Sequence, residues 1–147
     1  MQTLKYYTLS QFVLLAIIIM ASLSFTNQSA SEALLPDLQI TVPDSLFGSF
    51  CTNKHNKVYV KIANIGQYKA QGEVLVKLRI DPVRINRSVK IKVDLAPGQV
   101  RQVVFEKIKF RSGDNRITGI ANQEKVLAET NYYNNGQTKS VHVANCP

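Results

Sequence analysis

Two cysteines and two histidines are the side chains in this sequence best suited to chemistry. His55 follows Cys51 by four residues, and Cys146 follows His142 by the same spacing. Thiolates and imidazoles are ligands of zinc and copper, so pairing the two cysteines in space would assemble a Cys2His2 site. The other outcome is a disulfide between Cys51 and Cys146, which an even cysteine count favours in an exported chain. We predict the disulfide, with the four-residue metal site as the alternative.

Catalysis has little material in this chain. Its 147 residues include only two histidines and two cysteines. The sequence places no acidic or amide side chain to orient a histidine beside a cysteine nucleophile. We therefore expect a protein that is not an enzyme and that needs no cofactor.

Basic residues are concentrated in the middle of the chain. The formal net charge is +8, from 18 Lys and Arg against 10 Asp and Glu. Between residues 77 and 92 the only acidic residue is Asp81, and the basic residues are Lys77, Arg79, Arg84, Arg87, Lys90 and Lys92. Such a cluster predicts attraction to an anionic glycan or polymer of the cell envelope, to lipid headgroups at a membrane surface, or to a protein partner.

The composition of the basic cluster argues against one partner and leaves one alternative role. Nucleic acid is not an expected partner, because aromatic side chains that stack on bases are not interleaved with these charges. The alternative to a binding role is a solvated surface that keeps the protein soluble.

An asparagine-rich stretch near the C-terminus carries a second candidate site. Its oxygen-bearing side chains are Glu129, Asn131, Asn134 and Asn135. They suit a hard cation such as calcium, but with a single carboxylate the stretch is more typical of turn formation by asparagine. Within it, Tyr132 and Tyr133 predict a contact loop, with one of them able to pack on the domain instead.

The N-terminus has the pattern of a secretory signal. A single charge, Lys5, precedes an apolar run over residues 12–20 and a stretch of small residues. The run is shorter than the roughly 20 apolar residues of a membrane span. We predict a signal peptide over residues 1–33, cleaved between residues 24 and 33, a mature domain over 34–147, and a secreted or periplasmic location. An uncleaved N-terminal anchor is the alternative.

The remaining chain must position these groups, and its pattern is that of β-strands. Apolar residues alternate with polar ones, which places Val58, Val60 and Ile62 on one face of an extended strand. The same alternation recurs elsewhere and predicts seven strands, over residues 37–42, 57–62, 73–80, 88–95, 99–110, 115–121 and 138–144. Seven short strands separated by turn residues predict an all-β, antiparallel sandwich.

Two of these strands carry more specific expectations. In residues 88–95 the alternation directs Val89, Ile91, Val93 and Leu95 inward and Lys90 and Lys92 outward. In residues 99–110 three consecutive apolar residues, Val103, Val104 and Phe105, interrupt the alternation. We expect a β-bulge there, or a crossing from one sheet to the other.

Four segments of the chain stand in a characteristic order: LPDLQI at 35–40, VKIANIG at 60–66 followed by Ala70, LAPG at 95–98 and VLAETNYYNN at 126–135. In this order they resemble the CARDB family, the cell-adhesion-related domain of bacteria. The resemblance implies an immunoglobulin-like β-sandwich, found as a module in large secreted or surface proteins, without catalytic residues.

The expected function is therefore an exported binding or structural module, adhesion-related or engaging anionic envelope material through its basic residues. The alternatives are a small exported metal-binding protein that uses the Cys2His2 cluster, and a periplasmic accessory or inhibitor of another exported protein.

Overall fold

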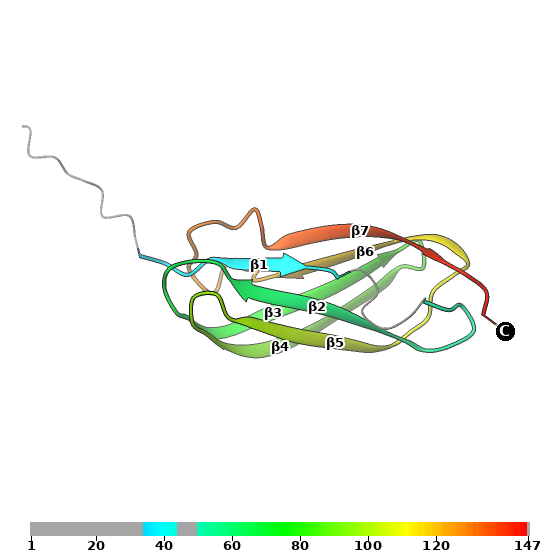
Figure 1. Ribbon diagram of the computed structural model, residues 1–147, viewed down its shortest axis with the longest axis horizontal. Helices are drawn as coiled ribbons and strands as arrows, with labels where there is room; N and C mark the ends of the chain where they lie inside the picture. The colour runs from blue at the N-terminus through cyan, green and yellow to red at the C-terminus, as the bar shows by residue number, and fades with distance from the viewer. Residues whose placement is uncertain (1–33, 44–49, 147) are drawn as a thin grey trace, which may run out of the picture. The chain divides into compact units, whose positions relative to one another are not determined.

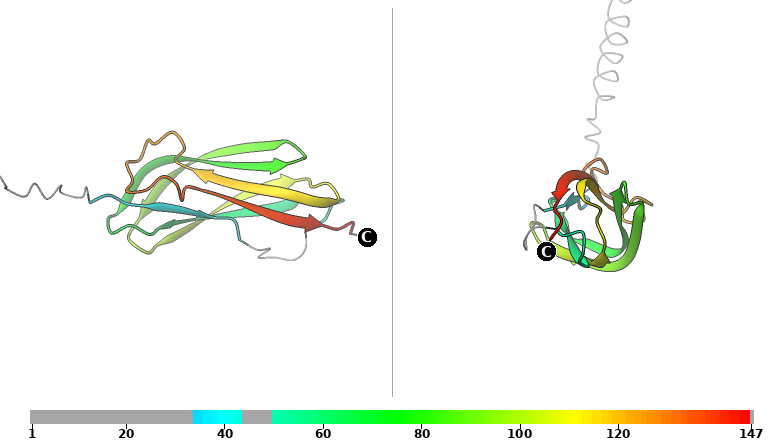
Figure 2. Two further views of the ribbon diagram at one scale, coloured as in Figure 1. Left: turned by 90° about the horizontal axis from the view of Figure 1, so that it is seen from above. Right: turned by 90° about the vertical axis from the view of Figure 1, so that its right-hand side faces the viewer.

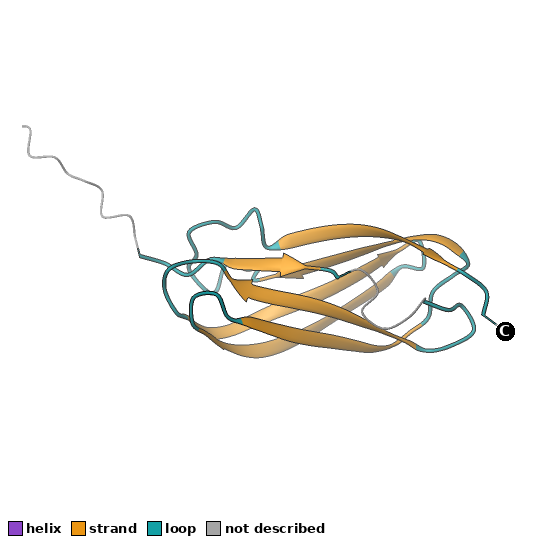
Figure 3. Cartoon of the chain, in the orientation of Figure 1, coloured by secondary structure: helices purple, strands orange, loops and turns teal. Residues whose placement is uncertain are grey.

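Seven β-strands and their connecting loops make up the part of the chain that the structure describes. The structure, a computed structural model, describes residues 34–43 and 50–146, so the predicted signal peptide lies outside the described residues. The strands are β1 (Leu38–Thr41), β2 (Asn56–Asn64), β3 (Ala70–Asp81), β4 (Ile85–Leu95), β5 (Val100–Ile108), β6 (Gly113–Ala121) and β7 (Gly136–Val143) (Figures 1 and 3). The predicted all-β fold is confirmed.

The strands form two antiparallel sheets. One sheet has the order β1-β2-β5 and the other the order β4-β3-β6-β7. In Figure 1 strands β2 and β5 of the first sheet lie in front of β3 and β4 of the second. The apolar faces of the two sheets meet, which is the arrangement of an immunoglobulin-like sandwich.

The core consists of the alternating residues that the sequence pattern directs inward. Val58, Val60 and Ile62 of β2 are buried. The corresponding residues of β3 are also buried; they are Val74, Val76, Leu78 and Ile80. Because a strand places successive side chains on opposite faces, their neighbours on both strands lie on the outer faces of the sandwich.

The first half of β4 differs from the prediction. Val89 is 36% exposed and Ile91 is only partly buried, whereas Val93 and Leu95 are buried. β4 is the edge of a four-stranded sheet that faces a three-stranded one. The three-stranded sheet therefore does not cover the first half of β4. The inward-facing residues there stay exposed although they alternate with polar ones.

The fifth strand also differs from the prediction, because its alternation is not interrupted at residues 103–105. Val103 and Phe105 are buried and Val104 is exposed, so the alternation continues through these residues. The bulge lies further along: β2 residues Asn56 and Val58 pair with Ile108 and Phe105, so one residue of β2 faces two of β5. Lys107, at the bulge, has a left-handed φ of 57°. β5 remains paired with β2, so the predicted crossing between sheets is wrong.

The loops gather at the two ends of the sandwich. The β2–β3, β4–β5 and β6–β7 loops lie at the end where β1 begins, and the β3–β4 turn, the β5–β6 loop and the end of β7 lie at the other (Figure 1). β1 and β7 run side by side in the same direction (Figure 2). Within the described ranges no helix is both long and apolar enough to cross a membrane.

Candidate functional site

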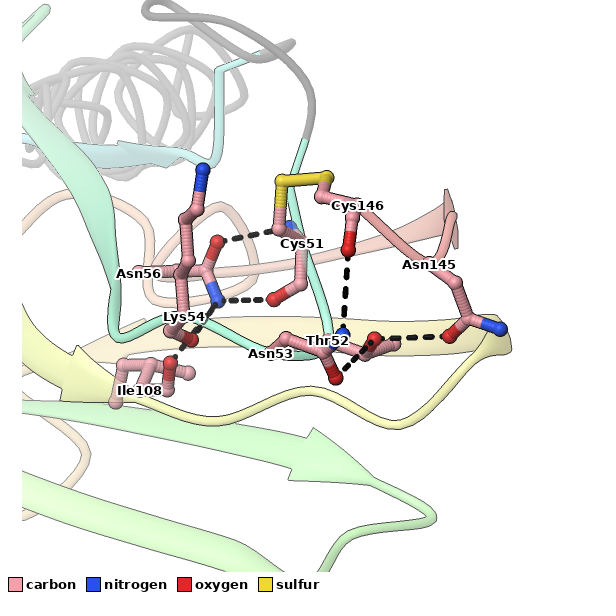
Figure 4. The surroundings of a disulfide bond; sticks show 8 residues. All are labelled: Cys51, Thr52, Asn53, Lys54, Asn56, Ile108, Asn145 and Cys146. Atoms are coloured by element: carbon pink, nitrogen blue, oxygen red, sulfur yellow. Dashed lines mark hydrogen bonds between the residues drawn. A yellow bond between two sulfur atoms is a disulfide. The ribbon is translucent and has the colours of Figure 1, made fainter.

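The two cysteines form a disulfide at the end of the sandwich where β7 finishes. Cys51 and Cys146 are bonded, with their Cα atoms 5.4 Å apart (Figure 4). Cys51 also makes a parallel bridge with Ala144, and the backbone N–H of Thr52 donates to the Ala144 carbonyl at 3.3 Å. The side chain of Asn56 holds Cys51 from the other side, accepting from its N–H at 3.0 Å and donating to its carbonyl at 2.8 Å. The bond thus joins the segment before β2 to the end of β7.

The histidines do not complete a metal site with these cysteines. His55 is exposed, and His142 faces outward on β7, where its Nδ1 lies 2.8 Å from Oδ1 of Asp114. Both sulfur atoms are used in the disulfide, so no thiolate is present to bind a cation. Among the described residues no group of three or more His, Cys, Asp or Glu side chains is arranged to hold a metal ion. The four-residue alternative is not assembled in this structure.

Four of the six clustered basic residues share the outer surface of the four-stranded sheet. Lys77 and Arg79 point outward from β3, because the residues between and beside them are buried. Lys90 and Lys92 of β4 pair with Leu75 and Glu73 of β3 and lie on the same surface. We refer to Lys77, Arg79, Lys90 and Lys92 as the basic face.

Ion pairs divide the basic face into two parts. Lys77 Nζ lies 2.7 Å from Oε1 of Glu124, and Arg79 Nε lies 2.9 Å from Oδ2 of Asp81. The hydrogen bond from Lys77 lowers the pKa of Glu124. Lys90 and Lys92 have no ion pair within the described chain, so their charges are the most available to an anionic partner.

The other two predicted basic residues do not belong to this surface. Arg84 lies in the turn between β3 and β4, with a left-handed φ of 55°. Arg87 pairs with the buried Leu78 and therefore points to the opposite side of the sheet, where it is exposed because β4 is an edge strand. Arg116 of β6, which pairs with Asp81, lies on the outer surface instead.

Glu129 in the β6–β7 loop is a buried carboxylate with three hydrogen-bond donors. It is 5% exposed. Its Oε2 accepts from the backbone N–H of Leu38 in β1 at 2.6 Å, and its Oε1 accepts from Asn122 and from Asn135, the latter at 2.8 Å. Burial raises the pKa of the Glu129 carboxyl, and the three hydrogen bonds offset part of that effect. The carboxylate joins the β6–β7 loop to the first strand.

The asparagines of the same stretch have similar roles. Asn134 donates from Nδ2 to Oδ1 of Asp37 at 2.8 Å, and its carbonyl accepts from the N–H of Ile40 at 3.1 Å. Asn131 accepts from the N–H of Tyr133 at 2.9 Å and stabilises a turn. These contacts explain the Glu and Asn residues as loop-forming groups. Both oxygens of Glu129 accept from N–H groups, whereas Oδ1 of Asn134 and Oδ1 of Asn135 are buried and have no hydrogen-bond partner among the described residues. Calcium binding by this stretch stays a hypothesis.

The two tyrosines of this loop are placed differently. The hydroxyl of Tyr132 accepts from the N–H of Glu129 at 3.1 Å and donates to the carbonyl of Leu127 at 3.3 Å. Lys125 Nζ lies 4.8 Å from the centre of its ring. Tyr133 is 99% exposed. Tyr132 is therefore fixed to the domain, and Tyr133 is available for contact.

A hollow of about 670 Å³ lies between this loop and the outer surface of β6 and β7. Its floor includes Thr118 and Ile120 of β6 and Thr138 of β7, and the hydroxyls of the two threonines lie 2.9 Å apart. The loop contributes Asn131, Tyr132 and Tyr133. Since Arg79 pairs with Thr118 and Lys77 with Ile120, the hollow adjoins the basic face.

Most of the described chain matches the model of one known family. The CARDB family model matches residues 35–139. The chain belongs to the CARDB family. No curated protein sequence matches it.

Two solved CARDB-like structures have the same fold. A CARDB domain from Pyrococcus furiosus, solved in complex with di-metal ions, superimposes with a TM-score of 0.60 at 23% identity, covering 77% of this chain and 97% of that one. A domain from a protein assigned to the cell surface in Methanosarcina acetivorans gives a TM-score of 0.60 at 23% identity, covering 76% of this chain and 95% of that one. At this identity the likeness establishes the fold.

Sequence reasoning missed two features of this CARDB domain. Arg116 lies outside the basic window, although the alternation along β6 is sufficient to place it on the outer surface. The hollow has no signal in the sequence, because residues 122–135 have no periodicity and their path depends on the buried partners of Glu129 and Asn135.

Proposed function

We propose that this CARDB domain is an exported, non-catalytic recognition module whose basic face binds anionic polymer of the cell envelope. The observation that carries the proposal is the gathering of Lys77, Arg79, Lys90 and Lys92 on one outer surface. Charges that lie on one surface add their fields, whereas the same charges scattered over a domain do not.

Two features support the exported location. Disulfides persist in oxidising compartments, and Cys51 and Cys146 are bonded. The apolar run over residues 12–20 has the length of a signal segment. The intact mass of the exported protein is expected to correspond to a chain that begins between residues 25 and 34.

The binding role is tested with a charge-reversed variant. Arg79, Lys90 and Lys92 are replaced together by Glu, and binding to linear polyphosphate and to polygalacturonate is measured at increasing salt. We expect the wild type to bind both polymers less tightly as salt rises, because exposed charges are screened over about 8 Å at physiological ionic strength. The triple variant is expected to lose this binding and to keep its fold, since the three side chains are exposed.

A matched control separates the position of the charge from its amount. Lys54, Lys109 and Arg111 are also exposed and lie outside the basic face. Replacing these three by Glu changes the net charge equally, so we expect this variant to retain most of the binding. Equal loss in both variants, or no binding by the wild type at low salt, would contradict the proposal.

A further inference from the structure

We propose that the hollow between the β6–β7 loop and the outer surface of β6 and β7 holds a carboxylate-bearing sugar ring, one unit of an acidic polysaccharide. This inference rests on the proposed function, because it assigns a place and a chemical class to a unit of the anionic polymer. It goes beyond the proposed function in that it requires a ring and not only a charge.

The size of the hollow and its position suit one unit of a longer chain. Its volume, about 670 Å³, falls within the roughly 300–1,000 Å³ of sites that bind small molecules. The hollow lies on the outer surface beside Lys77 and Arg79, which pair with its floor residues on β6. A polymer that crosses the basic face can therefore place one unit in the hollow.

Two amide side chains supply hydrogen-bond donors at this site. Gln123 and Asn131 both line the hollow. Each uses its oxygen within the protein: Gln123 accepts from Lys77, and Asn131 accepts from the N–H of Tyr133. The orientation of each amide is thereby fixed, and within the described residues the two amide nitrogens have no partner. They remain to donate to a ligand.

The charge around the hollow favours a ligand with acceptor oxygens. No carboxylate is among the described side chains that line it, and Lys125 lines it. Lys77, which donates to Gln123 beside the hollow, is ion-paired with Glu124, so Lys125 is the cation at this site. The hydroxyl, ether and carboxylate oxygens of an acidic sugar match these donors, and a carboxylate gains charge-assisted hydrogen bonds.

The tyrosines supply the apolar contact that a sugar ring requires. A pyranose ring has a face of C–H groups in addition to its rim of hydroxyls, and an aromatic ring covers such a face. Tyr132 is held by two hydrogen bonds through its hydroxyl, and Tyr133 stands free at the rim. A tyrosine side chain has few rotatable bonds, so it contributes contact area at a small entropic cost.

The test compares three probes on the mature, disulfide-bonded domain: tetragalacturonate, a neutral galactose tetrasaccharide and linear polyphosphate. We expect tetragalacturonate to shift the side-chain amide NMR signals of Gln123 and Asn131. Tyr133→Ala is expected to weaken tetragalacturonate binding at least tenfold and to leave polyphosphate binding unchanged. Tyr133→Phe, which keeps the ring, is expected to bind tetragalacturonate within about threefold of the wild type.

Tyr68→Ala is the matched control, since Tyr68 is an exposed tyrosine in the β2–β3 loop outside the hollow. Circular dichroism and thermal unfolding check that each variant is folded. If Tyr133→Ala and Tyr68→Ala bind tetragalacturonate as well as the wild type, while the basic-face variant binds neither polyanion, the sugar site is wrong and the proposed function stands. Equal binding of the neutral tetrasaccharide overturns the acidic assignment. If the wild type binds neither polyanion, both proposals fail.

Discussion

Glu129 shows why a carboxylate is buried in a domain without a proposed catalytic role. An isolated buried charge is costly, but here both oxygens accept from N–H groups that would otherwise be buried without partners. One donor belongs to β1, one to the residue after β6 and one to the residue before β7. A single side chain therefore satisfies backbone and side-chain groups from three parts of the domain.

Replacing this carboxylate by an amide is expected to destabilise the domain. In Glu129→Gln the new NH2 group faces either the N–H of Leu38 or the amides of Asn122 and Asn135, so at least one donor loses its acceptor. We expect the free energy of unfolding to fall by about 1–3 kcal/mol, measured by urea denaturation. Glu73→Gln is the control, and at that exposed position we expect a change within about 0.5 kcal/mol. Equal stability of the two variants would refute this role of Glu129.

The raised pKa of Glu129 gives this residue a defined pH dependence. When the folded-state pKa lies above the unfolded-state value, the stabilising contribution is complete below the unfolded-state pKa and is lost as pH rises through the folded-state pKa. We expect the stability of the wild type relative to Glu129→Gln to decrease as pH rises from below the ordinary Glu pKa through the raised folded-state pKa. A carboxyl ¹³C titration is expected to give a midpoint for Glu129 above about 4.3. A relative stability that increases with pH would mean that the hydrogen bonds outweigh burial.

The sequence predicted this stretch as loop-forming but did not predict its contacts. Asparagine is common in turns, so the composition of residues 129–135 was sufficient to place a loop there. The partner of Glu129 in β1 is Leu38, 91 residues earlier in the chain. Contacts of that kind depend on the folded arrangement of strands, which alternation alone does not specify.

At the scale of the strand, alternation was reliable where two sheets face each other and failed at an edge. β2 and β3 lie inside their sheets, and their predicted inward residues are buried. β4 has the same alternation but an exposed Val89. The pattern shows which side chains share a face, and the neighbouring sheet decides whether that face is covered. Four of the six basic residues lie together because alternation puts them on one face, whereas Arg84 lies in a turn and Arg87 on the opposite face of β4.

Substitution by glycine at the bulge in β5 is not expected to destabilise the domain, unlike glycine elsewhere in the strand. Lys107 has a φ of 57°, which costs a residue with a Cβ atom about 1–2 kcal/mol. Glycine avoids this cost, so we expect Lys107→Gly to keep or raise the free energy of unfolding. Gln102→Gly, at an exposed position in the same strand, is expected to lower it by about 0.5–1 kcal/mol. Denaturant unfolding of the two variants measures the difference, and a larger loss for Lys107→Gly would contradict the bulge geometry.

For the whole molecule, the disulfide closes a loop with a sequence separation of 95 residues. Replacing both cysteines by serine is expected to lower the free energy of unfolding by about 2–5 kcal/mol. Cys51→Ser alone is expected to cost as much as the double replacement, because either change removes the same bond. Alkylation of the denatured, unreduced wild type is expected to find no free thiol. Two free thiols with one bound zinc would favour the Cys2His2 alternative.

The position of the disulfide also determines how the domain carries a mechanical load. β1 begins at one end of the sandwich and β7 ends at the other (Figure 1), so tension applied before β1 and after β7 acts along the strands. The shortest covalent path between the ends runs from residue 34 to Cys51 and crosses directly to Cys146. Strands β2 to β7 lie outside this path and are shielded from the pull.

In optical tweezers the oxidised domain is therefore expected to lengthen by no more than about 60 Å, the extended length of the segment before Cys51 at about 3.3–3.6 Å per residue. Reduction is expected to release the 95-residue loop, about 300 Å more. A tether with these properties stays short under strain as long as its surroundings remain oxidising.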